Sequence, residues 1–149
     1  MNFSMFGPLT LSALVTLGTI FVHALPLNAT VNLFRSEKKI GRVGVGFWID
    51  IIIVARVILY ALAAHLVEIG LWALLFVLCG QFHDFAPAYY HSAVNFTTLG
   101  YGDMVMAPRW RLLGPLEAAD GMLMFGVSTA MIFAVIQGLI QARFVDLKE

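Results

Sequence analysis

The stretch that decides the fold of this chain reads Thr97-Thr98-Leu99-Gly100-Tyr101-Gly102-Asp103. Its two glycines stand at alternate positions, and glycine takes the left-handed backbone region at little steric cost. This spacing favours a backbone that alternates between right- and left-handed conformations. Gly-Tyr-Gly-Asp alone is also typical of an ordinary turn, so the segments around the heptad decide between the two interpretations.

The composition places the chain in the membrane class, because 60% of its 149 residues are hydrophobic and only 12% are charged. Three apolar stretches are long enough to cross a bilayer, which takes about 20 helical residues. They run from about Phe6 to Leu25, within Phe47 to Cys79, and from about Gly114 to Gln141. We expect the first stretch to be a retained span, because no Lys or Arg precedes it as in a signal peptide. The formal net charge of zero gives no electrostatic case for nucleic-acid binding.

Placed between two such segments, the heptad resembles the selectivity filter of potassium channels, and the resemblance covers about Tyr60 to Gln141. It implies that backbone carbonyls hold K+ in place of water. The ion-coordinating segment is then Thr98, Leu99, Gly100, Tyr101 and Gly102, with K+ at the carbonyls of the first four and at the Thr98 hydroxyl. We expect the side chains of Leu99 and Tyr101 to turn away from the axis into packing.

A short helix is predicted directly before the heptad, over Pro87 to Phe96, and Asp84 and Pro87 can start it. Its C-terminal end would point its partial negative charge at the ion. The residues expected to support the filter are Thr97, Asp103, Val94, Tyr90 and His91. Asp103 would accept hydrogen bonds behind the filter or attract cations. Many family members have Trp-Trp where this chain has Tyr90-His91, and some have a carboxylate at the position of Val94.

The third apolar segment resembles the pore-lining inner helix of the same family. Gly121 falls where the family often has its hinge glycine. A helical period puts Met122, Phe125, Thr129 and Phe133 on one face, which we interpret as the pore face. The alternative is that this face contacts lipid or neighbouring helices.

Ionisable residues inside the apolar segments form two pairs at i, i+3 spacing, His65 with Glu68 and Glu117 with Asp120. Because the two helices run antiparallel, the pairs are expected to meet behind the filter as a titratable cluster. Acidification should then alter flux, and His65→Gln should remove most of that response without changing selectivity. The alternative is that the four residues only tie the helices together or share a proton. A metal site is possible by residue type, but no tight ligand spacing supports it.

The basic residues predict the orientation. Arg35, Lys38, Lys39 and Arg42 crowd the first connection, which the positive-inside rule assigns to the cytoplasm. The N-terminus and the heptad then lie outside the cell (inner) membrane, and the C-terminus is cytoplasmic. The predicted organisation is an N-terminal transmembrane helix (1–30), a basic cytoplasmic connection (31–46), a pore domain (47–141) and a short cytoplasmic tail (142–149). Pro26, just after the first span, and the glycines at 41, 44 and 46 predict a flexible connection into the second span.

The sequence therefore predicts an all-α membrane protein with a potassium-channel-like pore domain (outer helix, re-entrant pore helix plus filter, inner helix) and one extra N-terminal transmembrane helix. The resemblance implies a homotetramer that conducts K+ passively, surrounded by membrane lipids. No catalytic residues and no cofactor besides the permeant ion are expected. Two alternatives remain open. One is a non-conducting accessory or sensor subunit that uses the pore fold. The other is a weakly selective cation channel, which would need a filter without its Tyr or a Gly.

Overall fold

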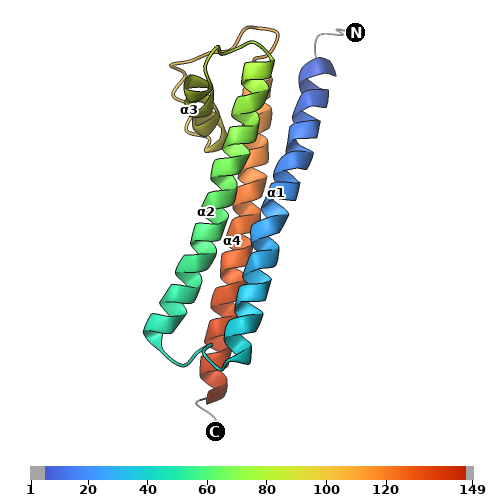
Figure 1. Cartoon of the computed structure of the whole chain (residues 1–149). Helices are drawn as coiled ribbons and strands as arrows, with labels where there is room; N and C mark the ends of the chain where they lie inside the picture. Colours follow the sequence, from blue (N-terminus) through green and yellow to red (C-terminus); the bar gives the residue numbers. More distant parts are fainter. Residues whose placement is uncertain (1–5, 147–149) are drawn as a thin grey trace. The chain divides into compact units, whose positions relative to one another are not determined.

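The structure, a computed structural model, describes residues 6–146 and contains four helices within them (Figure 1). These are α1 (Phe6–Lys39), α2 (Phe47–Leu78), α3 (Phe85–Phe96) and α4 (Leu113–Asp146). Three of them, α1, α2 and α4, are long and apolar enough to cross a membrane. At about 1.5 Å per residue, α3 is too short to do so. No strand occurs among the described residues, so the predicted all-helical fold is confirmed.

The connection between the first two helices differs from the prediction. Pro26 was expected to open a flexible segment, but α1 continues through it to Lys39, and residues 31–39 are helical. Proline removes one helical hydrogen bond, which membrane helices tolerate because neighbouring groups satisfy the freed carbonyl. Lys38 and Lys39 also suit the last turn of a helix, where the helix dipole favours cations. Only residues 40–46 therefore connect α1 to α2.

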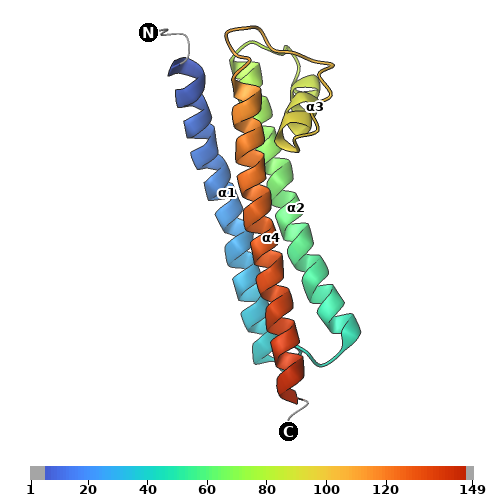
Figure 2. The same ribbon diagram turned by 180° about the vertical axis from the view of Figure 1, so that it is seen from behind.

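The chain divides into two compact units, and the first comprises residues 6–22 and 65–125 of the described chain. Its core contains large side chains with no exposed surface, among them Trp72, Phe76, Phe96 and Leu113. Within this unit α3 lies beside α2 in both views (Figures 1 and 2). Asp84 is the N-cap residue of α3, as predicted, although its side chain makes no capping hydrogen bond. The heptad thus follows a helix whose last residue, Phe96, is anchored in the core.

The second unit comprises residues 23–64 and 126–146 of the described chain. Its apolar core is accompanied by two ion pairs between helices. Arg56 Nη1 lies 3.2 Å from Glu37 Oε1, and Arg143 Nη2 lies 2.7 Å from Asp50 Oδ2. Asp50 also accepts a hydrogen bond from the Gly44 amide at 3.1 Å. Charges inside an apolar segment are costly and are usually paired, which explains the placement of Arg56.

Candidate ion-conducting site

The backbone of the heptad alternates in handedness. Thr98, Gly100 and Gly102 have φ angles of 61°, 61° and 74°, whereas Leu99 and Tyr101 are outside the positive-φ region. The alternation predicted at the two glycines is confirmed. The left-handed conformation of Thr98 was missed, because a β-branched residue pays a steric penalty there and the sequence gives no sign of it.

The amides of the heptad point back to the end of α3. Val94 O accepts hydrogen bonds from the amides of Leu99 (3.0 Å) and Gly100 (3.2 Å), and Asn95 O accepts one from Thr98 N (2.8 Å). In contrast, no hydrogen bond within residues 6–146 uses the carbonyl oxygens of the segment 98–101. Val94 thus supports the heptad through its carbonyl, and four successive heptad carbonyls stay available as cation ligands.

Thr97 connects the heptad to α3 and is the C-cap residue of that helix. Its amide donates to Ala93 O at 3.1 Å, and its hydroxyl donates to the same carbonyl at 2.6 Å. The C-terminal end of a helix carries partial negative charge. The first residue of the heptad is therefore fixed to the helix end that favours a cation.

Asp103, at the other end of the heptad, is held by Tyr90 of α3. The Tyr90 hydroxyl donates a hydrogen bond to Asp103 Oδ2 at 2.9 Å. This bond raises the pKa of Tyr90, because the neutral phenol is the form that donates to the carboxylate. The prediction that Asp103 accepts a hydrogen bond behind the heptad is confirmed, and its partner is a phenol on α3.

His91 was expected to support the filter, and the structure places it in an aromatic pocket. Its ring centroid lies 5.5 Å from that of Phe76 and 5.2 Å from that of Phe82. The Asn95 amide nitrogen lies 3.0 Å from His91 Nε2 and can donate to it. Burial lowers the pKa of His91, because desolvation disfavours the charged ring. The neutral imidazole therefore helps to pack α3 against α2.

The side chains of Leu99 and Tyr101 do not make the predicted packing within one chain. They are 55% and 67% exposed, respectively. The packing predicted for these two side chains is therefore not formed within the described chain.

Gly121 of α4 lies against the end of α3. A Cβ atom at this position would lie 2.1 Å from the carbonyl oxygen of Phe96, closer than real Cβ contacts come. The structure gives a packing reason for this glycine, and the hinge suggested by the sequence stays a prediction. The four side chains predicted to line a pore, Met122, Phe125, Thr129 and Phe133, are all exposed on the single chain.

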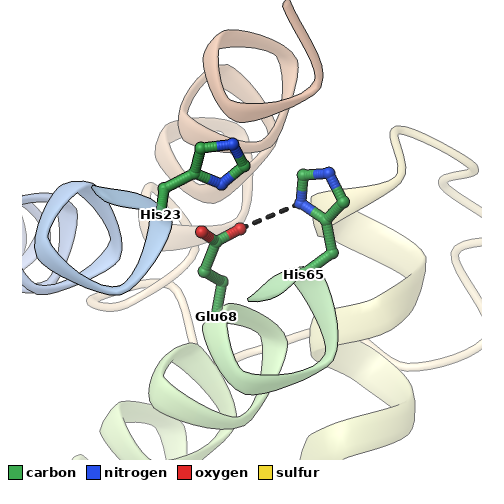
Figure 3. A group of neighbouring side chains, drawn as sticks. All are labelled: His23, His65 and Glu68. Atoms are coloured by element: carbon green, nitrogen blue, oxygen red, sulfur yellow. Dashed lines mark hydrogen bonds and ion pairs between the residues drawn. The ribbon is translucent and has the colours of Figure 1, made fainter. Parts of the chain in front are cut away.

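The four residues of the predicted titratable cluster are all buried. His65 Nδ1 lies 2.9 Å from Glu68 Oε2, one turn away on α2 (Figure 3). The His65 ring also contacts that of Phe125 on α4, with 4.4 Å between centroids.

Neutral partners accompany the two α4 carboxylates of that cluster. Asp120 Oδ2 accepts hydrogen bonds from Trp72 Nε1 at 2.8 Å and from the Thr19 hydroxyl at 2.9 Å. Glu117 Oε1 is hydrogen-bonded to the Ser92 hydroxyl of α3. Sequence reasoning missed these three partners, because nothing in their spacing marks them as contacts of α4.

A family model matches the part of the chain that begins with α2 and ends within α4. Residues 47–138 match the model of a family described as "Ion channel". The match covers α2, α3, the heptad and most of α4, and α1 lies outside it. No match was found among curated proteins, and none among solved structures.

Proposed function

The chain belongs to the ion channel family and is a multi-pass membrane protein, and we propose that it is the subunit of a potassium-selective channel. The observation that carries this proposal is the heptad backbone. Its handedness alternates, the amides of its first four residues bond to α3, and its carbonyl oxygens at residues 98–101 accept no hydrogen bond in the described chain. Carbonyls in such an array can replace the hydration shell of K+.

The proposal requires several copies of the chain around one axis, because each chain supplies one carbonyl ladder. Cyclic symmetry of identical subunits closes such a ring, and the potassium-channel resemblance implies four. The exposed side chains of Leu99 and Tyr101 support this assembly, since a neighbouring chain can bury them. The exposed face of Met122, Phe125, Thr129 and Phe133 is then available to line the path below the filter.

Conduction in this arrangement is passive. K+ exchanges its water for the carbonyl oxygens and the Thr98 hydroxyl, and it passes from one ring of oxygens to the next. The C-terminal end of α3 favours the cation at the inner end of the ladder. At the outer end, the bond from Tyr90 to Asp103 fixes the mouth. The basic residues at the end of α1 and in the α1–α2 connection (Arg35, Lys38, Lys39 and Arg42) support an orientation with the heptad outside the cell membrane and the C-terminus in the cytoplasm.

Flux through liposomes that contain only this purified chain tests the proposal. We expect K+ flux and little Na+ flux. If the wild-type protein passes neither ion, the chain is an accessory subunit, and equal passage of both ions identifies a weakly selective channel. Either outcome contradicts the proposal.

Gly100→Ala provides the matched test of the filter residues. There is space for the methyl group, because a Cβ at Gly100 would meet its nearest atom at 4.0 Å. The left-handed φ nevertheless costs about 1 kcal/mol or more in each subunit. We therefore expect the variant to insert into the membrane and lose its preference for K+. Gly126→Ala is the control, since that glycine is helical and a Cβ there meets nothing within 4 Å.

A further inference from the structure

A groove of ≈ 250 Å³ runs between α1 and α4 within the second unit. Apolar side chains form most of its wall, including Leu27 and Val31 of α1 and Met131 and Val135 of α4. Leu27 and Val31 are also exposed at the surface, so the groove is open to the surroundings of the helices. In a membrane, such a groove takes a hydrocarbon chain.

Thr30 lines this groove and carries a buried hydroxyl that is unsatisfied in the described chain. The residue is 3% exposed, and its Oγ1 atom has no hydrogen-bond partner in the described part of the chain. Thr10 of the same helix behaves differently: its hydroxyl donates to the backbone carbonyl of Phe6, in the preceding turn, at 2.9 Å. A buried polar group without a partner is costly, so a ligand that brings an acceptor oxygen is favoured here.

Arg35 places a positive charge at the same groove. It is exposed, and none of the ion pairs among residues 6–146 involves it, whereas Arg42, Arg56 and Arg143 are each paired. Lys38 and Lys39 follow within about one turn of the helix. This rim of the groove therefore suits an anionic group.

We propose that the groove binds an anionic glycerophospholipid. One acyl chain lies along the apolar wall, an ester carbonyl accepts a hydrogen bond from Thr30, and the phosphate pairs with Arg35. Thr30 and Arg35 both line the groove, and their positions are about 7.5 Å apart along the helix axis. Basic pockets between membrane helices are known to select anionic headgroups. The site is largely built by α1, outside the matched ion-channel region, and its existence does not depend on conduction.

Native mass spectrometry of the purified chain tests the headgroup contact, with phosphatidylglycerol and phosphatidylcholine of identical acyl chains as probes. We expect preferential retention of phosphatidylglycerol. Arg35→Gln should lower retention of phosphatidylglycerol about fivefold and leave phosphatidylcholine unchanged. Arg111→Gln makes the same charge change at an exposed residue of the first unit and should alter neither. Equal retention of the two lipids by the wild type, or equal effects of the two substitutions, overturns the proposal.

The ester contact has its own test, which needs no substitution. A di-ether analogue of phosphatidylglycerol keeps the headgroup and chains but lacks the ester carbonyls, so the wild type should bind it about fivefold more weakly. Thr30→Val should weaken the binding of the ester lipid to the level of the ether analogue and leave the binding of the analogue unchanged. Equal binding of ester and ether lipids by the wild type contradicts the assignment. Displacement of the lipid by inorganic phosphate also contradicts the assignment. If the monomer retains lipid but the assembled protein does not, a second copy of the chain fills the groove. That result also overturns the proposal.

Discussion

At the scale of single residues, Gly121 sets how closely α4 approaches the end of α3. Because a Cβ would lie 2.1 Å from the Phe96 carbonyl oxygen, Gly121→Ala must push the two backbones apart. We expect the free energy of unfolding in detergent to fall by about 1 to 3 kcal/mol, the usual cost of overpacking. Gly126→Ala, in the same helix with nothing within 4 Å, should be neutral or slightly stabilising. Equal effects of the two substitutions would refute the close contact.

His91 gives a pH dependence of stability. Burial lowers its pKa in the folded protein below the value in the unfolded chain. As the pH falls through the unfolded pKa of about 6.5, the unfolded chain takes up the proton first, so stability is lost on acidification. The loss continues until the pH reaches the lower folded pKa, and above the unfolded pKa the residue contributes no pH dependence.

The matching measurement is the free energy of unfolding at about pH 7.5 and about pH 5. His91→Phe keeps an aromatic ring between Phe76 and Phe82 and should lose less stability on acidification than the wild type. His83→Gln serves as the control, because His83 is exposed. A pH dependence that is the same in all three proteins would show that His91 does not titrate between the two states.

Some of these residue roles could be predicted from the sequence, and others could not. The left-handed positions of Gly100 and Gly102 follow from local sterics, which need no knowledge of neighbours. Asp103 could be identified as an acceptor, but Tyr90 as its donor depends on how α3 meets the heptad. The contact of Gly121 with Phe96 likewise joins two elements, so it becomes visible only when both helices are placed.

At the scale of elements, α1 is attached to the pore domain of the first unit by polar contacts as well as by apolar packing. The Thr19 hydroxyl donates to Asp120 of α4. Thr19→Val keeps the shape of the side chain and removes this bond, so we expect a loss of about 1 kcal/mol in the free energy of unfolding. Thr10→Val should change little, because Thr10 is exposed and bonds within its own helix. If Thr19→Val is as neutral as Thr10→Val, the hydrogen bond does not stabilise the attachment.

The element boundaries show where local rules fail. The start of α3 at Asp84 was predictable, because Asp and the following Pro87 favour a first turn. The same kind of rule failed at Pro26, where apolar surroundings and packing keep α1 helical through a proline. Helix-breaking signals derived from water-exposed helices are therefore weaker in a chain of this composition.

At the scale of the whole molecule, the proposed tetramer would bury side chains that one chain leaves exposed. Tyr101 is 67% exposed, so Tyr101→Ala should hardly change the stability of the monomer. The same substitution should shift the assembly from tetramer toward monomer, because the lost contacts lie between chains. Native mass spectrometry at several protein concentrations measures the shift, and circular dichroism on heating monitors the helices. If the variant assembles like the wild type, Tyr101 is not part of the interface between chains.

The two left-handed glycines of the heptad also have a genetic consequence. A cation bound by carbonyl oxygens is recognised by the shape of the main chain, which every amino acid shares. A one-base change in a glycine codon keeps glycine, gives a codon for a residue with a Cβ atom, or gives a stop. Every single-base missense change at Gly100 or Gly102 therefore puts a side chain at a φ of 61° or 74°. No single-base missense change at these two codons therefore leaves the position without a Cβ atom.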